Sequence, residues 1–278
     1  MASIANGLAA YNRGTFVPVT SSFFMFYLVS QFLIPNKFHS DLSQYAAPGV
    51  RMGALQELQV IHIATHDSIG TGEDGPTHQP IELAALYRAM PNLLYIRPCD
   101  SEEVAGAMMV ALRSKHNSTI ISTSRQNLRQ WPESKRTEVA KGAYVFHDVE
   151  NASVTLIGVG SEMCFAIEAT EKLNAVGVAA RVVSFPCQRL FEKQSWEYKR
   201  QVLRRSETVV VVVEAYAANG WERYADASIS MKTFGKSLPG NDAYRYFGFD
   251  SGVIADKIKG HVDDIEGGRM FKNEFVEL

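Results

Sequence analysis

Residues 65–82 form a polar, glycine-containing segment whose side chains could bind a small hydroxylated molecule. The segment contains His66, Asp74 and His78, and the apolar run at 60–64 leads into it. Histidine and aspartate supply fixed hydrogen-bond donors and acceptors of the kind that sugars require. A segment that follows a strand of an open α/β sheet lies at the carboxyl edge of the sheet, where ligands bind. Considered singly, each of these residues is also compatible with a turn residue satisfied by its neighbours.

A second candidate group is the guanidinium of Arg125, in the segment Ser-Arg-Gln-Asn-Leu at 124–128. This segment follows the predicted strand at 119–123, so we expect Arg125 at the same edge of the sheet as residues 65–82. A guanidinium presents a fork of donors that matches phosphate oxygens. The residue type alone leaves open a surface arginine at a strand end.

Two other kinds of site are disfavoured at this loop. Residues 70–75 satisfy the G-x-G-x-x-G pattern of dinucleotide-binding proteins. That pattern requires its last glycine at the start of a helix, so that the pyrophosphate meets the helix dipole. Here we expect the helix to begin only at Pro80. A zinc site is disfavoured because neither the spacing of the histidines nor a nearby cysteine supports one at His62, His66 and His78.

The composition is that of an ordinary globular protein. The 278 residues are 46% hydrophobic and 21% charged with a net charge of −2, which predicts no attraction to nucleic acid or to a membrane. No apolar run approaches the ~20 residues that span a bilayer. The three cysteines are far apart in the sequence, which argues for a reducing compartment and against a disulfide framework. We therefore expect a cytoplasmic protein.

Strand-like and helix-like runs alternate along the chain and predict an α/β fold with two open, mostly parallel sheets that carry helices on both faces. A charged stretch suggests a first domain at 1–128, a linker at 129–145 and a second domain at 146–278. The predicted strands are the runs at 15–19, 58–64, 93–97, 119–123, 154–158, 180–184 and 208–213. The predicted helices are 2–10, 81–90, 102–115 (with Ser101 as its N-cap), 162–175 and 251–260.

Residues 65–82 resemble, almost letter for letter, the substrate-binding signature of the transketolases, which are thiamine-diphosphate enzymes. The resemblance covers nearly the whole chain and implies a pyrimidine-binding domain that lacks its start, followed by the carboxyl-terminal domain of the family. Nothing resembles the family's diphosphate-binding domain with its GDG-type metal motif. Residues 1–7 resemble the segment after the family's catalytic glutamate, which we therefore expect upstream of Met1. Residues 233–237 and 247–249 match carboxyl-terminal patterns that imply fold and interface.

The resemblance also implies roles for individual residues on the substrate side. His66, Asp74, His78 and Arg125 would bind the substrate, and His78 would also take part in catalysis. By the same resemblance Arg125 would bind the sugar phosphate, and Asp74 would bind the hydroxyl next to the carbonyl. No residue of this chain is assigned to a metal.

On the cofactor side, the resemblance implies that Phe23, Phe26 and Tyr45 cradle the aminopyrimidine ring of thiamine diphosphate. This chain would hold only the pyrimidine end, because the diphosphate and its Mg²⁺ or Ca²⁺ would need the missing domain. An insertion at 29–44 separates the first two aromatics from Tyr45, and removing it restores a family-like Phe-Met-Phe-x-x-Tyr-Ala segment. We expect a retained intron or an equally recent insertion here, and poor order.

The function implied is transfer of a two-carbon ketol unit between sugar phosphates, with no activity expected from this truncated chain alone. Its partner would be a second copy in a homodimer or a complementary diphosphate-binding subunit. One alternative is a relative of dihydroxyacetone synthase, which uses formaldehyde as the acceptor and would place the protein in peroxisomes. The other alternative is a non-catalytic truncated product or partner subunit.

Overall fold

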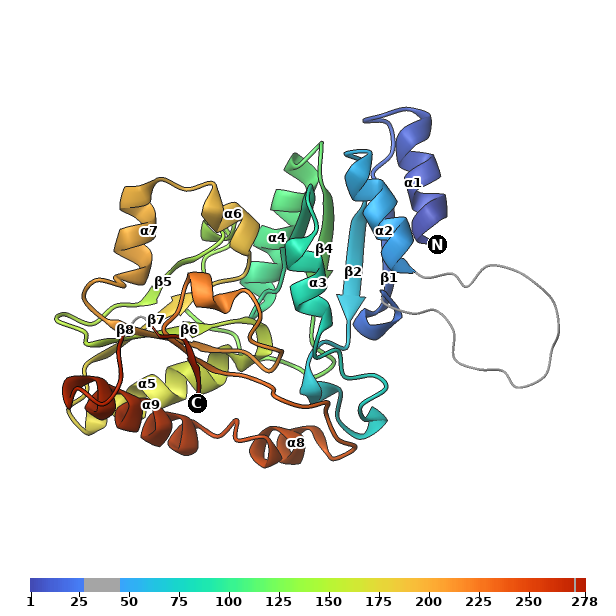
Figure 1. Ribbon diagram of the computed structural model, residues 1–278. Helices are drawn as coiled ribbons and strands as arrows, with labels where there is room; N and C mark the ends of the chain where they lie inside the picture. The colour runs from blue at the N-terminus through green and yellow to red at the C-terminus, as the bar shows by residue number, and fades with distance from the viewer. Residues whose placement is uncertain (28–45, 273) are drawn as a thin grey trace.

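The computed structural model describes residues 1–27, 46–272 and 274–278. These residues form two mostly parallel sheets with helices against them, which confirms the predicted fold class (Figure 1). Tyr45 and the predicted insertion at 29–44 lie outside the described residues. Within the described ranges, no helix is both long enough and apolar enough to cross a membrane.

The first sheet is parallel and has the strand order β1-β2-β4-β3. Its strands are β1 (Val19–Phe23), β2 (Ile61–Thr65), β3 (Leu93–Ile96) and β4 (Ser118–Ser122). Its helices are α1 (Ala2–Tyr11), α2 (Ala46–Leu55), α3 (Leu83–Ala89) and α4 (Ser101–Arg113). Ile120 of β4 packs in a cluster with α2 and α3, whereas its neighbour Ile121 packs in a cluster with α4. Helices therefore cover both faces, as alternate side chains of a fully buried strand require.

The second sheet has the order β10-β9-β8-β6-β7-β5 and is parallel except for β5, which pairs antiparallel with β7. Its strands are β5 (Tyr144–His147), β6 (Val154–Gly158), β7 (Ala180–Ser184), β8 (Val209–Val213), β9 (Ala227–Ile229) and β10 (Val276–Glu277). Its helices are α5 (Met163–Ala175), α6 (Gln188–Glu192), α7 (Trp196–Leu203), α8 (Gly240–Tyr246) and α9 (Ser251–Glu266). Val211 of β8 packs with α5 and α9, and Val212 packs with α6 and α7 on the opposite face. The last two residues of the predicted linker belong to β5.

The strand predicted at 15–19 was wrong, because β1 begins only at Val19 and runs to Phe23. The carbonyl of Pro18 accepts a hydrogen bond from the amide of Ile61 at 2.9 Å, and pairing with β2 then continues to Phe23. β1 is an edge strand whose side chains are exposed or half-buried. Its polar Thr-Ser-Ser sequence therefore carries little of the apolar pattern that marks a buried strand.

The predicted N-cap of α4 was also wrong by one residue. The carboxylate of Asp100, not the hydroxyl of Ser101, accepts a hydrogen bond from the amide of Glu103 at 3.0 Å. The same Asp100 carboxylate accepts bonds from the Trp131 amide and the Ser134 hydroxyl. These additional donors come from the predicted linker, so the choice between the two capping residues depends on a tertiary contact.

His62 on β2 is fully buried, and its Nδ1 lies 2.7 Å from the Thr20 hydroxyl. Burial lowers the pKa of His62 from 6.5 to about 4. The unfolded chain therefore binds this proton first as the pH falls, and the stabilisation present above pH 6.5 is lost towards pH 4. We expect His62 to lower the free energy of unfolding by about 1 kcal/mol between pH 6 and pH 5. Urea unfolding of the unmodified chain and of His62→Gln at both pH values measures this contribution, and an equal pH dependence of the two proteins would contradict it.

Candidate functional site

The candidate residues follow three neighbouring strands of the first sheet. β1 ends at Phe23, β2 ends at Thr65 and β4 ends at Ser122, and all three strands are parallel. The residues after these strands therefore lie at one edge of the sheet. His66 is the first residue after β2, and Arg125 comes three residues after the end of β4.

His66 is the centre of the polar residues that the sequence singled out. Burial lowers its pKa, the charge of Arg125 lowers it further, Asp74 raises it and His78 lowers it. Asp74, His78 and Arg125 therefore each lie within electrostatic reach of His66. The lowered pKa keeps the His66 imidazole neutral at neutral pH, so the ring offers one donor and one acceptor. Asp74 and Arg125 are exposed and the two histidines are half-buried, so the cluster opens to solvent.

Two phenyl rings lie beside these histidines. The Phe23 and Phe26 centroids are 5.4 Å apart with planes only 9° from parallel. The ring of His66 stacks on Phe23 at a centroid distance of 3.7 Å, and His78 meets Phe26 edge-on at 5.8 Å. Both phenyl rings are half-buried, so part of a flat apolar surface adjoins the polar cluster. Tyr45, the third predicted aromatic, lies outside the described residues.

The second domain contacts the loop that carries Asp74. The Gln79 amide donates to the carbonyl of Gly72 at 3.0 Å and to that of Lys236 at 3.1 Å. The Ser237 hydroxyl donates to the carbonyl of Glu73 at 2.6 Å. Gly72 has a φ of +79°, and a Cβ there would lie 3.2 Å from the amide nitrogen of Gly240. Glycine therefore suits both the left-handed backbone conformation and the close approach of the second domain. The loop is thus shaped by both domains.

A buried ion cluster joins the two sheets behind the polar residues, and sequence reasoning missed it. Arg97 follows β3, is fully buried, and lies 2.7 Å from the Asp67 carboxylate. The Arg97 Nη1 also lies 2.5 Å from Glu162 and 3.2 Å from Glu214, which follow β6 and β8 of the second sheet. The carboxyl edges of the two sheets therefore meet. The sequence signal that could have revealed this cluster is a charged residue directly after an apolar strand, as at Arg97 and Glu214.

Arg88 of α3 completes this cluster. Its guanidinium makes two parallel bonds of 2.7 Å to the Glu214 carboxylate, which also accepts a 2.8 Å bond from the Trp221 indole. Burial by itself would raise the pKa of Glu214, but Arg88 and Arg97 hold it below its usual value. Glu214 is therefore charged, and its pairs with Arg88 and Arg97 link the domains through side chains that are almost entirely buried.

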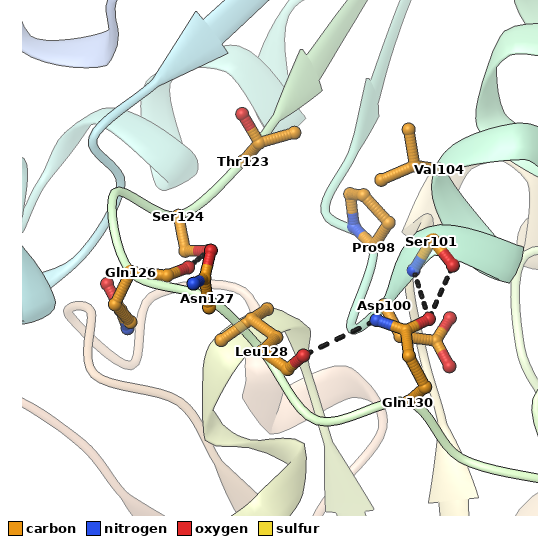
Figure 2. A pocket seen from close by; sticks show the side chains of 10 residues that line it. All are labelled: Pro98, Asp100, Ser101, Val104, Thr123, Ser124, Gln126, Asn127, Leu128 and Gln130. Atoms are coloured by element: carbon orange, nitrogen blue, oxygen red, sulfur yellow. Dashed lines mark hydrogen bonds between the residues drawn. The ribbon is translucent and has the colours of Figure 1, made fainter.

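A small pocket lies where β3 and β4 end and α4 begins (Figure 2). The neighbours of Arg125 in sequence, Ser124 and Gln126, line it. On the far side Gln130 accepts a bond from the Ser101 hydroxyl and donates to the carbonyl of Leu128 (Figure 2). The loop that presents Arg125 is thereby tied to the start of α4.

Comparison with known families assigns both parts of the chain. Residues 1–130 match the family described as transketolase, pyrimidine binding domain. Residues 142–250 match the family described as transketolase-like TK C-terminal domain. Together the two matches include every residue placed in the site above.

Curated relatives and solved structures agree with this assignment. Over its whole length the chain is 51% identical to the dihydroxyacetone synthase of Candida boidinii, of which it covers 37%. It is 40% identical to a probable transketolase of Schizosaccharomyces pombe over 95% of the chain and 36% of that relative. A Pichia stipitis transketolase in complex with sedoheptulose-7-phosphate superposes with a TM-score of 0.87 at 35% identity, over 96% of this chain and 37% of that one. The chain spans little more than a third of these relatives. It belongs to the transketolase family, of which it carries the pyrimidine-binding and carboxyl-terminal domains.

Proposed function

We propose that this chain provides the substrate side and the cofactor's pyrimidine site of a thiamine-diphosphate-dependent transferase that moves a two-carbon ketol unit between sugar phosphates. The observation that carries the proposal is the grouping of His66, Asp74, His78 and Arg125 beside two parallel phenyl rings at one sheet edge. The donors and acceptors suit a polyhydroxylated phosphate ester, and the rings suit a flat heterocycle.

The residues present fit the pyrimidine end of the cofactor. Phe23 and Phe26 offer a half-exposed, nearly planar apolar surface of the kind on which an aromatic ring stacks. Bound thiamine diphosphate would supply the nucleophilic carbon that carries the two-carbon unit. The diphosphate and its divalent cation would be held by a diphosphate-binding domain supplied by a complementary subunit.

In this scheme the chain binds and orients the sugar phosphate. Arg125 would hold the phosphate through charge-assisted bonds, and its exposure leaves the guanidinium accessible. Asp74 would accept a bond from the hydroxyl next to the carbonyl. The neutral imidazole of His66 would bind hydroxyl groups, and His78 would do so and also move a proton at the reacting oxygen.

The first expected outcome is that the purified chain has no measurable turnover with thiamine diphosphate, Mg²⁺ and a ketose–aldose phosphate pair. Adding a separately expressed diphosphate-binding half of a related transketolase, which carries the catalytic glutamate, should restore turnover. The assay is run with the unmodified chain, with a variant that lacks residues 29–44, and with Asp74→Ala as the inactive control. Full activity of the chain alone contradicts the dependence on a partner. If neither the unmodified chain nor the variant lacking residues 29–44 shows turnover with the added half, the result supports a non-catalytic subunit instead.

The 51% identity to a dihydroxyacetone synthase favours a second candidate acceptor, formaldehyde. Both candidates require the same donor site, so they differ in the acceptor and in the expected compartment, cytoplasm or peroxisome. Assaying the reconstituted enzyme with formaldehyde and with aldose phosphates at equal concentrations separates them. The acceptor with the higher kcat/KM identifies the activity.

A further inference from the structure

The backbone of the loop after β2 adopts conformations that non-glycine residues rarely take. Ser68 has a φ of +60° and a ψ of −171°, and His66 has a φ of +61°. Both conformations carry a cost in conformational free energy that neighbouring contacts must offset. Because His66 belongs to the candidate site, the contacts that hold this loop also bear on the position of its imidazole.

The contacts that hold Ser68 come from the second domain. The Ser68 hydroxyl donates to Glu162 Oε1 at 2.9 Å and lies 3.4 Å from the Tyr244 hydroxyl. The Ser68 amide donates to the Tyr216 hydroxyl at 3.3 Å. Ser68 is fully buried, so these groups replace water as its partners.

The anchor on the second domain is itself fixed. Glu162 accepts bonds from the Tyr244 hydroxyl at 2.8 Å and the Ala215 amide at 3.2 Å, and it pairs with Arg97. Besides the Ser68 hydroxyl, this carboxylate is held by a cation, by the hydroxyls of Tyr244 and Ser161 and by an amide, so it has little freedom to follow a moving loop. Glu162 therefore provides Ser68 with a rigid acceptor.

The strained segment transmits this constraint to His66. The Thr71 hydroxyl bridges the carbonyls of His66 at 3.0 Å and Ser68 at 3.2 Å. Ile69, next to Ser68, is buried in the apolar cluster formed with the second sheet. The backbone after His66 is therefore held by the Thr71 hydroxyl and by the burial of Ile69, and the imidazole of His66 stacks on Phe23.

We propose that Ser68 is a positioning residue through which Glu162, Tyr216 and Tyr244 of the carboxyl-terminal domain hold His66 in the substrate site. The importance of this role for turnover rests on the proposed function. It gives the carboxyl-terminal domain a part in the reaction although none of its residues belongs to the predicted substrate-binding set. Ser68 acts through His66 and touches no substrate itself.

Ser161 offers a matched control. Its hydroxyl donates to the same Glu162 oxygen at 2.7 Å and accepts a bond from Arg97 at 3.1 Å. Ser161→Ala therefore removes a buried hydroxyl from the same cluster without releasing the loop. Ser68→Ala removes the anchor and keeps the strain. Ser68→Gly removes the anchor and also relieves the strain, so it should fold even where the alanine variant does not.

The test uses the full chain labelled with ¹³C-histidine, in which loss of one signal in His66→Gln assigns the His66 Cε1–Hε1 resonance. Stacking on Phe23 should shift this resonance by the ring current of the phenyl group. Both Ser68 variants should move or broaden the His66 signal while that of buried His62 stays in place, and Ser161→Ala should leave both unchanged. An unchanged His66 signal in the Ser68 variants overturns the proposal, and so does an equal change in Ser161→Ala.

A second readout uses the enzyme reconstituted with a diphosphate-binding half. Ser68→Gly should lower kcat/KM for a ketose phosphate by about tenfold or more, in line with the cost of misplacing a substrate-binding group. Ser161→Ala should stay within about twofold of the unmodified enzyme. A reconstituted enzyme that never turns over contradicts the proposed function alone, because the histidine resonances test the positioning of His66 without any activity.

Discussion

Replacement of Arg97 by methionine is expected to lower the free energy of unfolding by about 3–5 kcal/mol. Arg97 has no exposed surface and pairs with Asp67, Glu162 and Glu214. Methionine fills a similar volume but leaves these carboxylates without the cation between them. Uncompensated charges in a water-free interior are strongly destabilising, whereas the intact pairs contribute less than their close distances suggest.

Urea unfolding followed by circular dichroism measures the loss, with the midpoint of the first transition as the readout. Arg136→Met is the matched control, because Arg136 pairs with Glu102 on the surface, where their side chains are 52% and 38% exposed. This control should show no measurable change, since solvent screens exposed pairs. If Arg97→Met unfolds at the same urea concentration as the control, the ion cluster does not hold the two domains together as we infer.

Replacement of Arg125 by alanine is expected to raise the Michaelis constant for a phosphorylated donor about 10- to 150-fold in the reconstituted enzyme. A hydrogen bond to a charged group contributes about 1.5–3 kcal/mol, and each 1.4 kcal/mol is about tenfold in affinity. Arg125 lies within electrostatic reach of His66 and is exposed, so a bound phosphate could contact the guanidinium directly. The turnover number should change far less, because the phosphate is remote from the reacting carbonyl.

The comparison that decides this prediction uses donors with and without a phosphate group. Arg125→Ala should leave the Michaelis constant of an unphosphorylated ketose nearly unchanged. Arg129→Ala is the matched control on the same loop, because Arg129 is also exposed but lies over the ring of Trp131, 4.3 Å from its centroid. Equal effects of Arg125→Ala on both donor types would show that Arg125 does not bind the phosphate.

Strands buried on both faces could be predicted from the sequence with accurate bounds. β6 and β7 occupy 154–158 and 180–184 as predicted, and β8 occupies the run of valines at 209–213. Such strands need apolar side chains on both faces, so a short uninterrupted apolar run identifies them. α9 was predicted to end at 260 but continues to Glu266, because its apolar positions continue to pack against the second sheet.

Edge strands with exposed side chains were harder to predict. β1 was placed four residues too early, and the edge strands β5 and β10 were not predicted, nor was the short inner strand β9. The edge strand β3, whose side chains are all buried, was predicted at 93–97 and lies at Leu93–Ile96. β1 and β5 are the outer strands on one side of each sheet, and β10 is the opposite edge of the second sheet. An edge strand is held largely by backbone pairing with one neighbour, and its exposed side chains need not alternate. The partner strand, rather than the local sequence, decides where such an element begins.

The sequence by itself determined that the loops carrying the candidate residues would meet at one sheet edge, whereas their proposed role in binding a sugar phosphate rests on the family resemblance. His66, Asp74 and Arg125 were chosen because residues 65–82 and 124–128 resemble transketolase motifs, and their common location follows because each segment comes after an apolar strand and parallel strands share a carboxyl edge. Only the tertiary structure decided how that edge is held. Arg97 pairs with Glu162 and Glu214 of the other domain, and Ser68 also bonds to Glu162. A buried charge or a strained backbone can be recognised only when the groups that surround it are known, and those groups are distant in sequence.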